Sequence, residues 1–370
     1  MTWVPPSARH PRPESTAETC YLRSVGRLTG SEAALALAAG LARPSGRPGE
    51  AYPLFEILQR RPGGGADRIL CPAASFSPSG APAVVERLTD LAARLTAPRP
   101  PWAGFALDRP LVMGIVNVTP DSFSDGGAFL DPAAAIAHGH RLWAEGADFL
   151  DIGGESTRPG ATPVSPETET ARVVPVIRAL AGAGAVVSVD TRRTAVMAAA
   201  LEAGARIVND VTALGDAGAV ALVARQRVPV VLMHMQGDPQ TMQQAPRYDV
   251  PALDLFDYFE ARLAACTAAG LDRGNILIDP GFGFGKTLAH NVELLRDLAL
   301  LRATGCGVLL GVSRKSSIGR LAGTVEIGDR LAGSLAAGLD GVRHGADVLR
   351  VHDVAGTVQS LRVARALENC

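Results

Sequence analysis

The sequence predicts an α/β protein with a (β/α)8 barrel, the TIM-barrel fold, preceded by an N-terminal accessory segment. Three observations lead to this prediction. After Asp108, short apolar runs rich in Val, Ile and Leu alternate with Ala-rich amphipathic stretches, which is typical of repeated βα units. Eight such runs occur between Leu111 and Cys370, a number that matches a closed barrel better than an open doubly wound sheet. The runs are continuously apolar, as expected for strands covered on both faces.

The N-terminal part, residues 1–105, differs from the rest of the chain. It is rich in proline and ends near the run APRPPWAG from Ala97, which indicates a domain boundary. Two helices and a strand pair are expected in it: Ser31–Ala42 and Ala83–Leu95, and Pro53–Leu58 with Ile69–Pro72. Because it holds no constellation of reactive side chains, it is predicted to be an accessory segment of unknown role before a barrel at residues 106–370.

Each strand of the predicted barrel is an apolar run that stops at a polar turn. The eight runs are LVMGIVNV from Leu111, FLDIGG from Phe149, VVSVDT from Val186, RIVNDVT from Arg206, VVLMHM from Val230, ILIDPG from Ile276, VLLGVSR from Val308 and VLRVHD from Val348. A helical stretch follows each run, as a parallel barrel requires.

Composition limits the partners and the compartment. The 36 basic residues nearly balance 37 acidic ones, so no strong field attracts nucleic acid or an anionic membrane. No 18-residue apolar run free of charge occurs, and the N-terminus lacks the apolar stretch of a signal peptide. The five cysteines are scattered and form no C-x-x-C pair. We therefore expect a cytoplasmic protein that acts on small molecules.

Polar residues gather where the predicted strands end, and catalytic groups of (β/α)8 barrels lie at those ends. The residues concerned are Asn117, Glu155, Thr157, Arg158, Asp190, Asn209, Asp210, His234, Asp279, Arg314, Lys315, Arg350, His352 and Asp353. A purely structural barrel gains nothing from so many polar groups at equivalent positions, because each must be hydrogen-bonded or stay in water. They predict one site for an anionic ligand.

The glycine-rich run GFGFGKT from Gly281 looks like a phosphate-binding loop, but its spacing argues against one. Three residues, not four, separate its outer glycines, and its third glycine comes one residue too early for a dinucleotide fingerprint. A nucleotide site is therefore not predicted here.

Taken together, the strand ends resemble those of the dihydropteroate synthase family. The resemblance rests on eight segments: MGIVNVTPDSFSDGG (Met113–Gly127), DIGGESTRPGA (Asp151–Ala161), SVDT (Ser188–Thr191), IVNDVT (Ile207–Thr212), LMHMQGDPQTMQ (Leu232–Gln243), IDPGFGFGKT (Ile278–Thr287), GVSRKSSIG (Gly311–Gly319) and RVHDV (Arg350–Val354). It runs from Leu111 to about Val363 and leaves the first 105 or so residues outside. Short motifs such as SVDT carry little weight alone, whereas the first and the last two segments are highly specific.

The resemblance implies a transferase of folate biosynthesis and a sulfonamide target. Members of this family join the aniline nitrogen of para-aminobenzoate to the methylene carbon of 6-hydroxymethyl-7,8-dihydropterin diphosphate, releasing pyrophosphate and forming 7,8-dihydropteroate. An SN1-like displacement is expected, because dihydropterin nitrogens can delocalise the charge on the methylene carbon. The residues that carry over as pterin contacts are Asp190, Asn209, Met233, Asp279, Phe284 and Lys315. Core packing explains Met233 and Phe284 almost as well.

The leaving diphosphate needs cationic donors and a metal. By the same resemblance, Asn117, Arg158, Arg350 and His352 contact the diphosphate, and Asn117 also binds Mg2+, the expected cofactor, through a hard oxygen. Arg350 and His352 alternate along the last strand and therefore face the same way.

Two loops, Thr119–Gly127 and Ser156–Thr162, are expected to close over the reaction. Thr157, Pro159 and Ser313 are assigned to the para-aminobenzoate pocket. The expected catalytic groups are Asp121, Asp125, Arg158 and Lys315, although the two aspartates fit a loop-capping role equally well.

A different class of function remains open, namely a pterin-binding module that presents methylfolate to a corrinoid protein. Such a module needs no diphosphate contacts, so NVTPDSFSDGG and RVHDV argue against it, and the chain has no D-x-H-x-x-G cobalamin motif. The family resemblance also implies a homodimer, for which the Ala-rich helices expected at Gly328–His344 and Thr357–Leu367 are the candidate surfaces.

Overall fold

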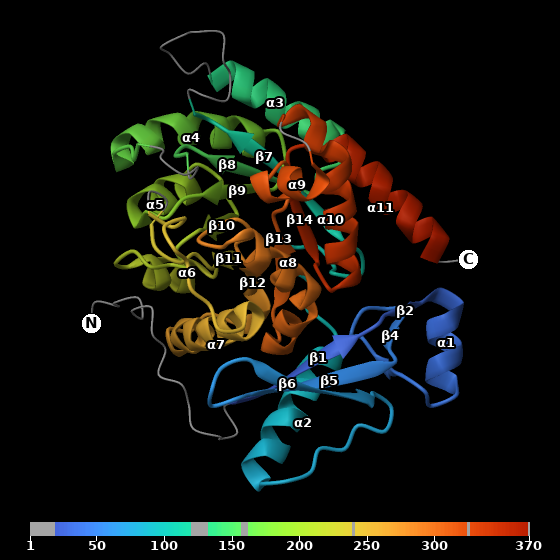
Figure 1. Cartoon of the computed structure of the whole chain (residues 1–370). Helices are drawn as coiled ribbons and strands as arrows, with labels where there is room; N and C mark the ends of the chain where they lie inside the picture. The colour runs from blue at the N-terminus through green and yellow to red at the C-terminus, as the bar shows by residue number, and fades with distance from the viewer. Residues whose placement is uncertain (1–18, 120–131, 157–161, 239–240, 324–325, 369–370) are drawn as a thin grey trace.

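The fold was examined in a computed structural model that describes residues 19–119, 132–156, 162–238, 241–323 and 326–368. From Leu111 onward the chain forms a closed barrel of eight parallel strands surrounded by helices (Figure 1). The strands follow one another around the barrel in chain order, and the last strand pairs with the first. The predicted (β/α)8 fold is therefore confirmed.

Each observed strand begins within one residue of its predicted start. The strands are β7 (Leu111–Asn117), β8 (Phe149–Gly153), β9 (Val187–Asp190), β10 (Ile207–Asp210), β11 (Val230–Met233), β12 (Ile276–Asp279), β13 (Gly307–Leu310) and β14 (Val348–Val351). The helices around them are α3 (Pro132–Ala144), α4 (Pro166–Gly182), α5 (Thr194–Glu202), α6 (Ala219–Gln226), α7 (Pro251–Ala268), α8 (Leu288–Arg296), α9 (Ser316–Ala322), α10 (Leu331–Arg343) and α11 (Val354–Glu368), with 3-10 helices η3 (Arg273–Asn275), η4 (Leu298–Thr304) and η5 (Gly328–Arg330).

Helix α4 illustrates why the stretches between strands are helical. Ser165 caps its N-terminus by accepting a hydrogen bond from the backbone N–H of Thr168 at 3.2 Å, and Pro166 occupies the first turn, where its missing N–H costs nothing. The fully buried residues Val173, Val176, Ile177 and Leu180 recur at helical spacing and face the barrel. One apolar stripe therefore fixes both the helix and the side that it buries.

Aromatic residues close the N-terminal end of the barrel. Trp102 is fully buried, and the backbone N–H groups and carbonyls of Trp102 and Phe105 bond to each other at 2.8 and 2.9 Å. Both rings stand edge-on to Phe149, with centroids 5.3 and 4.9 Å away. The boundary predicted after residue 105 falls inside this plug, so packing of the barrel begins at Trp102.

The N-terminal part is a small folded unit. Its elements are β1 (Cys20–Val25), β2 (Leu28–Thr29), α1 (Gly30–Ala38), β3 (Arg43–Pro44), β4 (Glu50–Tyr52), β5 (Leu54–Arg60), β6 (Ala66–Pro72) and α2 (Pro82–Thr96). Strands β1, β5 and β6 form an antiparallel sheet, and β2, β4 and β3 form a second one. The predicted pairing of Pro53–Leu58 with Ile69–Pro72 is confirmed, because these segments form β5 and β6. Strand β1 was not predicted, because Arg23 interrupts its apolar run.

Helix α1 is shorter than predicted. It ends at Ala38 rather than Ala42 because Gly40 adopts a left-handed conformation, with φ +65°, and Leu41 N–H returns to the carbonyl of Ala36 at 2.8 Å. This is the hydrogen-bond pattern that terminates helices at glycine.

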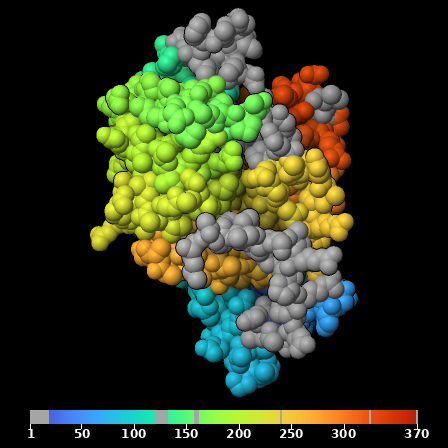
Figure 2. All heavy atoms as spheres, turned by 90° about the vertical axis from the view of Figure 1, so that its left-hand side faces the viewer, coloured from blue at the N-terminus to red at the C-terminus, as the bar shows by residue number. Residues whose placement is uncertain are grey.

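The N-terminal unit packs directly beneath the barrel against α7 and η4 (Figures 1 and 2), and a single hydrophobic core runs through both parts. The hydroxyl of Tyr21 donates to Asp257 in α7 at 2.9 Å, and its ring lies edge-on to Phe256 with centroids 5.5 Å apart. Arg60 forms an ion pair with Asp254 at 2.8 Å. The N-terminal unit thus packs as part of the barrel's own fold rather than being tethered to it.

A buried ionic triad joins the two parts below β14. The carboxylate of Asp347, which is fully buried, accepts from Arg47 of the N-terminal unit at 2.6 Å and from Arg302 of η4 at 2.9 Å. Burial raises the pKa of this carboxyl, but the two guanidinium groups outweigh burial and hold the pKa below its usual range. Removing the carboxylate takes from Arg302 its carboxylate partner and leaves Arg47 with only the longer ion pair to Glu50, at 3.3 Å.

Among the described residues, no helix has the length and apolar character needed to cross a membrane.

We therefore predict that Asp347→Ala lowers the free energy of unfolding by about 3–5 kcal/mol, the range found when one partner of a buried ion pair is removed. Chemical denaturation followed by circular dichroism measures the change. Asp67→Ala is the matched control, because Asp67 forms a solvent-exposed ion pair with Arg61 at 3.7 Å and should change stability by less than about 1 kcal/mol. Equal effects of the two variants would contradict the role of the triad.

Candidate functional site

A cavity of about 600 Å³ opens at the C-terminal ends of the barrel strands. The predicted site residues that line it are Asn117, Asp190, Asn209, Met233, Asp279, Phe284, Ser313, Lys315, Arg350 and His352. They come from seven different strands or the loops that follow them. Sequence positions more than 200 residues apart therefore share one site.

Five predicted site residues lie outside the described part of the chain, so their contacts are not assigned. They are Asp121, Asp125, Thr157, Arg158 and Pro159. Their proposed roles remain predictions.

A carboxylate inside the barrel organises one side of the cavity. Asp151 of β8 is fully buried, and its Oδ2 accepts from Arg350 Nε at 2.6 Å and from Asn209 Nδ2 at 2.9 Å. Arg350 Nη2 also donates to Asp190 at 2.7 Å. Hydrogen bonds thereby connect β8, β9 and β10 to Arg350 of β14, with Asn209 linked through Asp151.

The charges of this network are mutually dependent. Burial raises the pKa of Asp190, while the neighbouring Arg350 opposes the rise. Burial by itself disfavours the charge on Arg350, but Asp151 and Asp190 outweigh that cost and raise its pKa above the ordinary value. Arg350 therefore stays cationic at the centre of a carboxylate-lined wall.

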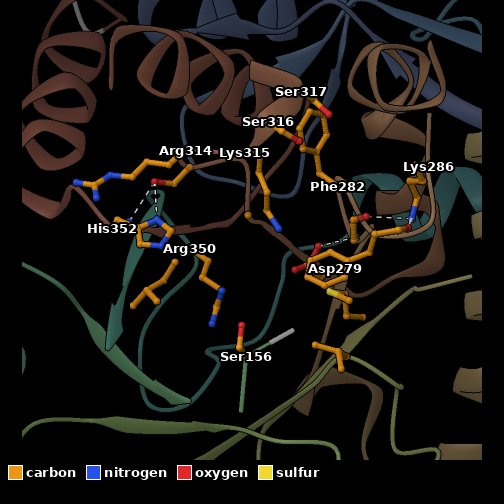
Figure 3. A pocket seen from close by; sticks show the side chains of 18 of the residues that line it. Ser156, Asp279, Phe282, Lys286, Arg314, Lys315, Ser316, Ser317, Arg350 and His352 are labelled. Carbon is orange, nitrogen blue, oxygen red and sulfur yellow. Dashed lines mark hydrogen bonds between the residues drawn. The ribbon is translucent and has the colours of Figure 1, made fainter. Parts of the chain in front are cut away.

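The opposite wall carries a second carboxylate and a lysine (Figure 3). Asp279 ends β12, and its Oδ1 accepts the backbone N–H of Gly281 at 2.7 Å. Lys315 points into the cavity, and its Nζ lies 4.1 Å from the centroid of the Phe284 ring. Burial and the nearby charge of Arg350 lower the pKa of Lys315 to about 8, with Asp279 acting in the other direction.

His352 follows β14 and borders the cavity next to Arg350 (Figure 3). Its Nδ1 lies 3.1 Å from Ser313 Oγ, and the same hydroxyl accepts the backbone N–H of His352 at 3.2 Å. Burial and the cations Arg350 and Arg314 lower the pKa of His352 to about 3. The ring is therefore neutral near pH 7 and offers a hydrogen bond rather than a charge. Ser313, expected in the para-aminobenzoate pocket, is here a partner of His352.

Sequence reasoning overlooked two residues that the structure gives central positions. Asp151 lies in the third position of β8, before the polar end of the strand, so the pattern of strand ends does not point to it. Lys286 lies in GFGFGKT, whose spacing does not predict a ligand site, yet it lines the cavity and is only 3% exposed. The rejection of a phosphate loop agrees with the structure, because Lys286 Nζ faces carbonyl oxygens of its own loop.

A closed parallel barrel whose strand ends join carboxylates, a carboxamide and an arginine in one cavity is the architecture of a pterin-binding enzyme. A family model described as "Pterin binding enzyme" matches residues 113–352. The chain is 54% identical over 267 residues to dihydropteroate synthase of Neisseria meningitidis serogroup B, covering 70% of this chain and 94% of that one. It is 47% identical over 261 residues to the Escherichia coli K12 enzyme, covering 70% and 92%.

Solved structures give the same result. Dihydropteroate synthase of Xanthomonas albilineans with 4-aminobenzoic acid superposes with a TM-score of 0.69 at 53% identity, covering 72% of this chain and 97% of that chain. The same enzyme in complex with 7,8-dihydropteroate gives 0.66 at 50% identity, with 72% and 96% covered. The chain belongs to the dihydropteroate synthase family. The family model begins at residue 113, so the N-terminal unit lies outside it.

The buried lysines provide a direct test of the electrostatics, since Lys286 and Lys315 are the two lysines of the chain. We predict that lysine-selective 13C labelling gives two side-chain signals whose pKa values lie near 7 for Lys286 and near 8 for Lys315, below the ordinary lysine pKa of 10.5. Burial is the main cause for both. Because the unfolded chain keeps these protons to higher pH, the two groups should make the free energy of unfolding rise with pH from about 7 to 10.5.

Lys286→Met assigns the signals by removing one of them. A midpoint near the ordinary lysine value for both signals would contradict the burial of these groups.

Proposed function

We propose that this chain is a dihydropteroate synthase that condenses 6-hydroxymethyl-7,8-dihydropterin diphosphate with para-aminobenzoate to 7,8-dihydropteroate and releases pyrophosphate. The observation that supports this most is one cavity with two kinds of wall, carboxylates and a carboxamide around Asp190, and cationic or neutral nitrogen donors around Arg350 and His352. Such a cavity suits a ligand that has a flat N–H-rich ring at one end and an anion at the other.

In this proposal the pterin ring lies between Asp190 and Asp279. Carboxylate and carboxamide oxygens of Asp190, Asn209 and Asp279 accept from the ring N–H groups, while Lys315 donates to its acceptors. Met233 and Phe284 supply apolar contact with the ring faces. Each acceptor is already oriented by a protein hydrogen bond, so little ordering is needed when the ligand binds.

The diphosphate end of the ligand is assigned to Arg350 and His352. Arg350 is held by Asp151 and Asp190, so its guanidinium is oriented before substrate arrives. Neutral His352 donates a hydrogen bond to a phosphate oxygen, and Ser313 fixes the ring through Nδ1. As the carbon–oxygen bond breaks in the SN1-like step, these donors stabilise the negative charge that moves onto pyrophosphate.

The proposed Mg2+ site uses Asn117 at the end of β7, with Oδ1 as its protein oxygen. Among the described residues no group of three His, Cys, Asp or Glu side chains can hold a metal by themselves. Asn117 lines the cavity, and its carboxamide oxygen is a hard donor of the kind that Mg2+ prefers, so Asn117 would hold the ion beside the substrate phosphates. When bound there, Mg2+ would neutralise part of the diphosphate charge.

The nucleophile in this proposal is the uncharged aniline nitrogen of para-aminobenzoate, which attacks the pterin methylene carbon as pyrophosphate departs. Its lone pair forms the new carbon–nitrogen bond, and its proton must then leave. Lys315, whose lowered pKa leaves part of its population neutral near pH 8, lines the cavity and is the candidate acceptor of this proton. Crystal structures of relatives with 4-aminobenzoic acid and with a sulfonamide drug support an aniline-bearing second substrate.

We further propose that the enzyme is a cytoplasmic homodimer. The support for a homodimer is an apolar surface on α10 and α11, where Leu331, Val363 and Leu367 are 40%, 56% and 73% exposed.

The alternative function, a pterin-binding module without turnover, lacks a use for the donors around His352.

Turnover separates these two functions. We predict that purified protein releases pyrophosphate only when dihydropterin diphosphate, para-aminobenzoate and Mg2+ are all present, as measured with a coupled pyrophosphate assay. Omission of each component in turn is the control. Tight pterin binding without pyrophosphate release would favour the binding module instead.

A second prediction concerns the anionic end of the cavity. His352→Ala should weaken binding of the pterin diphosphate by about tenfold, because a hydrogen bond to a charged group is lost, while free 6-hydroxymethylpterin binds nearly as before. Isothermal titration calorimetry compares the two ligands. His344→Ala, at the distant C-terminus of α10, is the matched control and should affect neither. Equal losses for both ligands would remove His352 from the diphosphate subsite.

A further inference from the structure

The cations of this chain are distributed in an unusual way. Among 36 basic residues the chain has two lysines, Lys286 and Lys315, and both line the same cavity wall. Arginine serves everywhere else. Lysine and arginine are not interchangeable where space is limited, since an ammonium group is compact and a guanidinium group is a wide planar fork. The proposed function uses Lys315 but gives Lys286 no role.

Lys286 lies at the end of the glycine-rich loop between β12 and α8, and its ammonium group is surrounded by acceptors. Its Nζ contacts the carbonyl oxygens of Gly281 and Phe284 at 3.0 Å each, the carbonyl of His234 at 3.4 Å and His234 Nδ1 at 3.0 Å. The loop therefore directs its carbonyls at an amine that donates hydrogen bonds, the reverse of a phosphate loop, which directs N–H groups at an anion.

Glycine is required for this loop conformation. Gly281 and Gly285 have φ of +64° and +58°, which other residues rarely adopt. A Cβ atom at Gly281 would lie 1.9 Å from the carbonyl oxygen of His234, and one at Gly285 would lie 2.5 Å from that of Gln236. The loop from β12 thus presses its backbone against the segment that follows β11, and Lys286 bridges the two.

Gly281 and Phe284, whose carbonyls accept from Lys286, also help to form the proposed pterin subsite. The N–H of Gly281 holds Asp279 Oδ1 at 2.7 Å, which leaves the other carboxylate oxygen for a ligand. The ring of Phe284 lies under Lys315 Nζ. In Figure 3, Asp279 lies between Lys286 on one side and Lys315 on the other.

We propose that Lys286 is a positioning residue for the pterin subsite, acting through the carbonyls of Gly281 and Phe284 to fix Asp279 and the Phe284 ring. This inference rests on the proposed function, because it assumes that Asp279 binds the pterin. Lys286 does not touch the ligand in this proposal. It determines where the groups that do so are held.

The first test compares two ligands on Lys286→Met, a substitution of similar length that removes the amine. Titration calorimetry should show that binding of 6-hydroxymethylpterin weakens about 10–100-fold, as expected when hydrogen bonds that orient a buried acceptor are lost. Binding of inorganic pyrophosphate should change less than about threefold, because Arg350 on β14 and His352 directly after it are held by other partners. Equal losses for the two ligands would overturn the proposal.

A double-mutant cycle then separates positioning from general loosening. If Lys286 acts through Asp279, Lys286→Met should cost much less affinity in an Asp279→Asn background than in the wild type. Fully additive losses would overturn the role. If Lys286→Met folds poorly, Lys286→Gln keeps two N–H donors without the charge and should give a smaller loss of the same pattern.

Two control variants sharpen the result. Lys286→Arg keeps the charge but not the compact shape and should not restore pterin affinity, since the carbonyls enclose an ammonium-sized group. His290→Ala removes the side chain that accepts from Thr287 N–H at 3.3 Å, loosening the start of α8 without touching the amine. If His290→Ala matches the loss of Lys286→Met, the proposal fails. Failure of the wild type to bind pterin would instead overturn the proposed function.

Discussion

Closure of the barrel is the constraint on which the rest of this structure depends. The pairing of β14 with β7 sets Arg350 level with Met113, β7 then pairs Ile115 with Asp151, and β8 pairs Gly153 with Asp190. Closure thereby brings the guanidinium of Arg350, from the last strand, within hydrogen-bond distance of the carboxylates of Asp151 and Asp190, from the second and third. The cavity and its charge pattern follow from that register, because a shift by one residue would turn these side chains away from the barrel interior.

In two networks of buried charge, groups of opposite sign compensate each other. At the C-terminal ends of the strands, Arg350 forms ion pairs with Asp151 and Asp190. Directly before β14, at the opposite end of the barrel, Asp347 forms ion pairs with Arg47 and Arg302. Taking such groups out of water costs several kcal/mol each, so these networks favour a particular arrangement more than they add stability. The network around Arg350 differs from the one around Asp347 because it borders the cavity. There a ligand with N–H donors can complete the hydrogen bonding of the carboxylates.

The N-terminal unit, which lies outside the family's barrel, also uses ion pairs to bind to it. Its contacts with α7 and η4 combine aromatic packing by Tyr21 with ion pairs made by Arg47 and Arg60. None of its described residues lines the cavity, which matches the absence of reactive groups in its sequence. A unit that shares the hydrophobic core of the barrel and covers its lower side contributes to stability directly, through the apolar area that it removes from water.

The sequence by itself determined the barrel, its eight strands and the chemistry of the strand ends, because an apolar run that stops at a polar turn is a local signal. It also pointed to Asp190, Asp279 and Arg350, which belong to short recognisable segments. Only the tertiary structure decided that Asp151 orients Arg350, that Trp102 plugs the barrel, and that Lys286 gathers carbonyls of its own loop. Those roles arise from contacts between distant strands or from positive φ angles, and neither is visible in residue spacing.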